Sequence, residues 1–116
     1  MIAKAYEKGG ESMQLALVEK LFSGYFEHEK DPAEPTWLSE EAASVGVGSK
    51  DEMVAFLESD EQKAEVAKGI KTAQQLGISG VPFFILHREG QEQQRYGISG
   101  AQEPDSFLPV FEKLVA

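Results

Sequence analysis

Few side chains in this chain could carry chemistry, because its 116 residues include no cysteine and only two histidines. Without cysteine there is no thiolate nucleophile, dithiol redox centre, disulfide or thiolate-bound metal. His28 stands between Glu27 and Glu29, but three consecutive side chains on a helix splay around its axis and do not converge on one ion. We therefore predict no catalytic residue, no metal site and no cofactor.

Two other residues are candidates for a base or a nucleophile, and both lack the partners they need. His87 stands beside Arg88 with no partner close in the sequence, so a surface or turn role is expected. Ser99 lies in a Gly-Ile-Ser-Gly segment without the histidine and aspartate pattern that activates a serine. Neither residue is expected to be catalytic.

The segment with the most specific local chemistry is Gly80-Val81-Pro82, between an expected helix end and an expected strand. A proline at the start of a strand has no N–H to donate, and it restricts the preceding residue to extended conformations. Val81 would therefore present its own N–H and C=O outward, where an extended peptide or a small thiol could dock by backbone pairing. On these residues alone, an ordinary turn before a strand is the simpler interpretation.

Four helices are expected in the first two thirds of the chain. The first should follow Ser12, and Gly24 within it should permit the close approach of a neighbouring element. Its buried face is expected to be an apolar stripe at helical spacing, made of Leu15, Val18, Phe22 and Tyr25.

Capping signals locate the other three helices. Thr36 is expected to cap the second helix, and Ser49 with Glu52 forms a capping box at the start of the third. Ser59 is expected to open the fourth helix in the same way, and Gly77 to stop it.

The last third of the chain predicts a β-hairpin and a closing helix. The apolar run at residues 83–86 is typical of a strand, Gly90 suits the turn, and residues 93–96 can return as the second strand. Pro109 should either kink the closing helix or restrict its regular part to residues after Ser106.

Charge and hydropathy exclude two classes of partner. With 20 acidic against 11 basic side chains the chain has a net charge of −9, which argues against an electrostatic nucleic-acid surface. No apolar stretch approaches the roughly 18 to 20 residues that span a bilayer, and the first residues lack the pattern of a signal peptide. A cytoplasmic location and no membrane partner are expected.

Several of these motifs resemble one known family. The run Gly80-Val81-Pro82-Phe83-Phe84, the hairpin, and the segment Tyr96-Gly97-Ile98-Ser99-Gly100-Ala101-Gln102 resemble the C-terminal part of the DsbA-like thioredoxin-fold proteins, in particular the FrnE-like branch. Residues 21–26, Trp37-Leu38 and Val45-Gly46-Val47 resemble the helical insertion of that branch. The resemblance implies an α+β, thioredoxin-like fold in which residues 1–116 form a single partial domain. Residues 10–77 would be the helical insertion, and residues 78–116 the proline loop, hairpin and C-terminal helix.

The resemblance also implies a site. In that family, the position of Pro82 is a cis-proline that faces the active site, and the position of Val81 pairs with the backbone of the bound substrate. We therefore expect Gly80, Val81 and Pro82 to bind substrate. The family's Cys-x-x-Cys and its first β-α-β unit have no counterpart here. Thiol–disulfide exchange requires a thiolate, so the chain is expected to be a redox-inactive member of an oxidoreductase family.

The missing strands have a physical consequence. A two-stranded hairpin is marginally stable in water, and its edges offer unpaired N–H and C=O groups. We expect self-association, or a missing N-terminal half, to complete the sheet.

Two alternative functions remain open from the sequence. The glutathione-dependent isomerase and kappa-class transferase branch looks similar around the proline, but this chain has Ala101-Gln102 where those enzymes usually carry an acidic and a basic residue. The other alternative is a non-enzymatic module that binds a protein partner at an exposed sheet edge.

Overall fold

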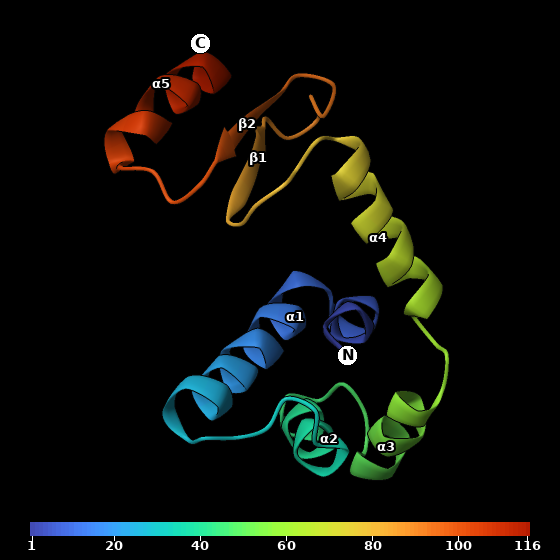
Figure 1. Cartoon of the computed structure of the whole chain (residues 1–116). Coiled ribbons are helices and arrows are strands. Elements are labelled where there is room, and N and C mark those ends of the chain that lie inside the picture. The colour runs from blue at the N-terminus through green and yellow to red at the C-terminus, as the bar shows by residue number, and fades with distance from the viewer. The chain divides into compact units, whose positions relative to one another are not determined.

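Five helices and one antiparallel hairpin make up the computed structural model, which describes all of residues 1–116 (Figure 1). This mixture confirms the predicted α+β class. Its elements in chain order are α1 (Ile2–Glu27), α2 (Pro35–Ser44), α3 (Lys50–Glu58), α4 (Lys63–Gln75), β1 (Phe83–His87), β2 (Arg95–Ser99) and α5 (Pro104–Val115). The chain divides into two compact units, Met1–Ile70 and Lys71–Ala116, which we call the helical unit and the hairpin unit.

A helical segment that was not predicted precedes the first predicted helix. α1 starts at Ile2 rather than after Ser12, because residues 2–8 are rich in alanine, lysine and glutamate, which favour helix. Gly9 and Gly10 leave helical geometry, with φ angles of −141° and 69°. The two glycines therefore divide α1 into two helices that meet at a kink, and the second one starts close to the position predicted after Ser12.

The side of α1 that is buried also differs from the prediction. Leu15, Phe22 and Tyr25 are each more than half exposed, whereas Leu17 and Gly24 are buried. Helical spacing shows that a face is apolar, but only packing against other elements decides whether it is covered. The core instead gathers apolar side chains from several elements: Ala5, Leu17, Ala42, Val47, Met53 and Phe56.

The prediction of a close approach at Gly24 is confirmed. A Cβ atom at this position would lie 2.1 Å from Cζ2 of Trp37, so only glycine admits the indole ring. Trp37 is 5% exposed, and its Nε1 donates a hydrogen bond to Glu41 Oε1 at 3.1 Å. This contact packs α2 against α1.

The predicted cap of α3 forms, whereas the predicted cap of α2 does not. Ser49 and Glu52 form the predicted capping box: the Ser49 N–H donates to Glu52 Oε2 at 2.7 Å, and the Glu52 N–H donates to Ser49 Oγ at 3.2 Å. These bonds to Ser49 lower the pKa of the Glu52 carboxyl. Thr36 does not cap α2, which begins at Pro35 with Glu34 before it. Proline suits the first helical position, because its missing N–H would have no partner there.

The expected cap at Ser59 is also wrong, because this residue ends α3 instead. Its hydroxyl donates to the Phe56 carbonyl at 2.7 Å and accepts from the Glu61 N–H at 3.1 Å, and α4 begins only at Lys63. Gly77 does follow the end of α4 as predicted, with a φ of 76°.

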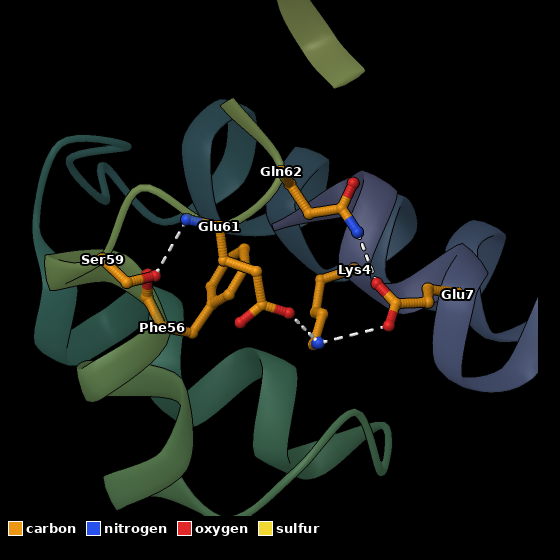
Figure 2. A network of polar contacts seen from close by, with 6 residues as sticks. All are labelled: Lys4, Glu7, Phe56, Ser59, Glu61 and Gln62. Atoms are coloured by element: carbon orange, nitrogen blue, oxygen red, sulfur yellow. Dashed lines mark hydrogen bonds and ion pairs between the residues drawn. The ribbon is translucent and has the colours of Figure 1, made fainter. Parts of the chain in front are cut away.

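Polar contacts hold the loop between α3 and α4 against the start of α1 (Figure 2). Lys4 contacts Glu61 and Glu7, and Gln62 donates to Glu7. The Lys4 ammonium also lies 5.9 Å from the centroid of the Phe56 ring. The hydrogen bond to Glu61 is the largest cause of a raised pKa at Lys4.

The hairpin forms as predicted, with a shifted second strand. β1 pairs antiparallel with β2 in a register that sets Phe84 opposite Ile98, and Gly90 in the turn has a φ of 77°. β2 runs from Arg95 to Ser99 rather than over residues 93–96, because residues 91–94 still belong to the turn. None of the helices is long and apolar enough to cross a membrane, and the cytoplasmic location stays a prediction.

One face of the hairpin packs on α5. Phe84 meets Phe107 edge-to-face at 5.1 Å between ring centroids, and the Lys113 ammonium lies 5.8 Å from the Tyr96 ring. α5 begins at Pro104 and continues through Pro109, so its regular part does not wait for Ser106.

Candidate functional site

The candidate site is the loop Gly80-Val81-Pro82, which joins the end of α4 to the start of β1. Val81 is 92% exposed, the highest value among the large apolar residues. The Val81–Pro82 peptide bond is cis in this structure. The three residues that the sequence assigned to substrate binding therefore lie together at one exposed corner of the hairpin unit.

A turn after β2 braces this loop. The Gly100 N–H donates to the Pro82 carbonyl at 2.8 Å, and Gln102 Nε2 donates to the Ser99 carbonyl at 2.8 Å. Gly100 has a φ of 86°, a left-handed conformation that favours glycine. The brace was not predicted; its only signal in the sequence was a glycine placed directly after the second strand.

The backbone of Val81 is free to bind. Neither its N–H nor its C=O makes a hydrogen bond within the chain, although its neighbour Pro82 is held by Gly100. Unpaired backbone groups on an exposed residue are what strand addition requires of a receptor. Val81 thus has the geometry expected of a residue that pairs with an extended peptide.

The free groups of Val81 continue along β1. Hydrogen-bonded positions alternate in an antiparallel ladder, and Pro82 occupies a bonded position opposite Gly100. The odd-numbered residues of β1 therefore turn their N–H and C=O away from β2. Together with Val81 they form what we call the β1 edge, made of Val81, Phe83, Ile85 and His87.

The side chains beside this edge leave a shallow hollow on the face of the hairpin that carries Phe83 and Ile85. The hollow has a volume of about 180 Å³, and Leu76, Arg95 and Gly97 also line it. The Phe83 ring lies over Gly97, where a Cβ would come within 2.9 Å of Cζ. Ile85 is 43% exposed, so this face is only partly covered within the hairpin unit.

The other residues considered from the sequence lie apart from this loop or serve local structure. His28 Nδ1 lies 3.0 Å from the Ser23 carbonyl at the end of α1, and His87 Nδ1 lies 3.2 Å from the Arg88 carbonyl. Ser99 contributes its carbonyl to the turn that braces the loop. No group of three or more His, Cys, Asp or Glu side chains is arranged to hold a metal ion.

The fold and the site define an α+β protein with an exposed proline loop before a hairpin and a closing helix. The family model for the DSBA-like thioredoxin domain matches residues 2–111. This chain therefore belongs to the DSBA-like thioredoxin domain family, as its resemblance predicted. Searches of curated proteins and of solved structures give no significant match. The assignment to the FrnE-like branch stays a prediction.

Proposed function

We propose that this chain is a DsbA-like family protein that binds extended peptide segments at Gly80-Val81-Pro82 and performs no thiol–disulfide exchange by itself. The observation that carries the proposal is Val81, which is 92% exposed and has an unpaired N–H and C=O. The family match over residues 2–111 supports the resemblance from which binding at the proline loop was inferred.

The redox part of the proposal follows from the covalent chemistry. In thiol–disulfide exchange a thiolate attacks a disulfide sulfur and forms a mixed disulfide. The chain contains no cysteine, and no other side chain forms that intermediate. Reduction of insulin by an added dithiol should therefore proceed at the uncatalysed rate in the presence of the chain. Turnover above that rate would contradict the proposal.

Peptide binding would use the backbone for affinity and the neighbouring hollow for selectivity. An extended peptide would pair with the N–H and C=O of Val81, and an apolar side chain of the peptide could enter the hollow beside Phe83 and Ile85. The Gly100 brace holds Pro82 in place, so the loop does not need to be ordered when the peptide binds.

Fluorescence anisotropy with labelled, cysteine-free peptides tests the binding. Val81→Pro removes the N–H at this position and should abolish binding, whereas Val81→Ala keeps both backbone groups and should retain it. Circular dichroism of both variants checks that the fold survives. Equal binding by the two variants, with the fold intact, would overturn the proposal.

Glutathione is the alternative ligand for this loop, and one contact argues against it. The Gln102 amide, which stands where a glutathione-binding side chain would be needed, already donates to the Ser99 carbonyl. Calorimetry should show no binding heat for glutathione under conditions where a peptide binds.

A further inference from the structure

The turn after β2 contains a glutamine that binds the backbone of this turn twice. Gln102 Nε2 donates to the Ser99 carbonyl at 2.8 Å, and the Gln102 N–H donates to the Gly100 carbonyl at 3.0 Å. Ser99 and Gly100 are consecutive residues, and Gly100 is the one that holds Pro82. Gln102 therefore binds the brace of the proline loop through both its backbone and its side chain.

The proline at the start of β1 leaves this end of the ladder one hydrogen bond short. Pro82 lies opposite Gly100, and a hydrogen-bonded antiparallel pair normally exchanges two N–H···O bonds. Only the bond from the Gly100 N–H to the Pro82 carbonyl forms, because proline has no N–H to return. The Gln102 N–H takes the place of that missing donor at the Gly100 carbonyl. The residue that shapes the site thus creates the vacancy that Gln102 fills.

The side chain of Gln102 acts on the same peptide group that holds Pro82. The Ser99 carbonyl and the Gly100 N–H are the two ends of one planar peptide group. Gln102 binds the carbonyl end of this group, and the N–H end binds the Pro82 carbonyl. A hydrogen bond accepted at the carbonyl end fixes the plane and polarises the group, which strengthens its N–H as a donor. Two hydrogen bonds in series therefore connect Gln102 with Pro82.

Fixing Pro82 also fixes how Val81 is presented. The pyrrolidine ring already restricts the φ angle of Pro82, and the bond from Gly100 to its carbonyl restricts the ψ angle. The Val81 carbonyl belongs to the peptide group that ends at the Pro82 nitrogen, so its direction follows that of Pro82. The contacts of Gln102 thus act on the exposed residue to which we assign peptide pairing.

We propose that Gln102 is the positioning residue of the proline loop. Its side-chain amide holds the Ser99–Gly100 peptide group in the orientation that binds Pro82, and thereby keeps the backbone of Val81 ready for an extended peptide. This inference rests on the peptide binding proposed above, and it assigns to that site a residue that does not itself pair with the peptide.

Amide hydrogen exchange in the free chain tests the first step without any ligand. Gln102→Ala removes the bond to the Ser99 carbonyl and should speed exchange at the Gly100 N–H by roughly two- to tenfold, the effect of one lost hydrogen bond. Gln93→Ala is the matched control, because Gln93 is an exposed glutamine in the hairpin turn whose side chain makes no hydrogen bond. It should leave the exchange at Gly100 unchanged.

Fluorescence anisotropy with a labelled, extended peptide that contains no titratable side chain tests the second step. Gln102→Ala should weaken binding by roughly two- to tenfold, whereas Gln93→Ala should bind as the parent chain does. Circular dichroism checks that both variants keep their folds.

Gln102→Glu separates positioning from a general loss of structure. At neutral pH its carboxylate can only accept hydrogen bonds, so it faces the Ser99 carbonyl without a donor and should bind the peptide at least as weakly as Gln102→Ala. Near pH 4 the side chain takes up a proton and can donate again. Its affinity relative to the parent chain should therefore rise as the pH falls, whereas that of Gln102→Ala should stay constant. Glu103 and Asp105, the nearest acidic residues along the chain, are common to all three proteins.

The outcomes separate this inference from the function on which it rests. Unchanged exchange at Gly100 in Gln102→Ala would overturn the inference, and so would equal peptide binding by Gln102→Ala and the parent chain, or a Gln102→Glu variant that does not recover at low pH. Peptide binding that depends on Val81 but not on Gln102 would leave the proposed function intact. A parent chain that binds no peptide would overturn the proposed function, and the exchange at Gly100 would still decide whether Gln102 holds the loop.

Discussion

The helical unit and the hairpin unit differ most in what they bury. The helical unit has a core of buried apolar side chains drawn from three helices and the loop that follows α2, and a capping box fixes the start of α3. In the hairpin unit only Ile98, at 9% exposure, reaches the same degree of burial. The helical unit thus contains its own packing partners, whereas the hairpin unit keeps unpaired backbone groups and an apolar face available for a partner.

This difference bears on how the proposed site would bind a peptide. A site that binds by backbone pairing needs an unfilled edge, and an unfilled edge costs stability unless something covers it. In this chain the edge begins at Val81, the residue to which we assign peptide binding, and continues along β1. A peptide bound at Val81 would therefore cover the start of this edge.

The largest effect on the helical unit is expected from loss of its central side chain. Leu17→Ala should lower the free energy of unfolding by about 2–5 kcal/mol, because Leu17 is fully buried. Leu15→Ala, on the exposed side of α1, should cost much less. Urea unfolding followed by the fluorescence of Trp37, the chain's only tryptophan, measures both changes. Equal losses would show that Leu15 is buried as well, as its spacing had predicted.

The contact at Gly24 predicts the next largest effect. Gly24→Ala should lower stability by about 1–3 kcal/mol, because the added Cβ displaces the Trp37 ring. Gly69→Ala is the matched control, since a Cβ at Gly69 meets nothing within 4 Å; the change should stabilise α4 by up to about 1 kcal/mol. The Trp37 emission maximum should shift for Gly24→Ala alone. Stabilisation by both substitutions would mean that α1 and α2 pack less closely than described.

A smaller effect is expected at the capping box. Ser49→Ala removes the hydroxyl that accepts from the Glu52 N–H and should cost about 1 kcal/mol. Ser44→Ala is a suitable control, because Ser44 Oγ bonds only a carbonyl near the end of α2. Thermal unfolding of both variants gives the comparison, and an equal loss for both would contradict a special role for the box.

The smallest effect concerns pH. Bonds from Ser49 hold the pKa of Glu52 below its ordinary value in the folded state. The stabilisation from the ionised carboxylate is therefore complete at neutral pH and is lost as the pH falls below about 4.5 towards that lowered pKa. Glu52→Gln should remove this part of the acid dependence and leave the parts that come from Glu40 and Asp60, whose pKa values are lowered by Lys50 and Lys63. An unchanged pH profile for Glu52→Gln would refute the assignment.

Features set by local rules were predictable from the sequence. The capping box at Ser49, the glycine at the end of α4 and the hairpin around Gly90 all depend on residues close in the chain. The exposure of Phe22 and Tyr25 was not predictable, because an apolar stripe does not reveal which elements reach it. The prediction that Ser59 starts a helix was wrong for a related reason, because a serine hydroxyl fits the end of one helix as well as the start of the next.

The candidate site likewise has features that could be predicted from the sequence and features that could not. Val81 and Pro82 could be proposed from the sequence because proline restricts its neighbour and because the surrounding motif resembles a family. The match over residues 2–111 confirms that family, and the role of the two residues stays a proposal. The bond from Gly100 to Pro82 joins residues 18 positions apart, and no local pattern announces it. The Gly100–Pro82 bond also fixes which residues of β1 have paired and which have unpaired backbone N–H and C=O groups, so the sequence alone could not predict that pattern.

Amide hydrogen exchange at Val81, with and without a cysteine-free extended peptide, tests the central claim, which is that the backbone of Val81 pairs with a peptide. The Val81 N–H makes no hydrogen bond within the chain, whereas the Ile98 N–H lies inside the ladder. We expect fast exchange at Val81 in the free chain and slower exchange once a saturating peptide is bound, with the exchange of Ile98 unchanged. Equally fast exchange at Val81 with and without bound peptide would contradict the account.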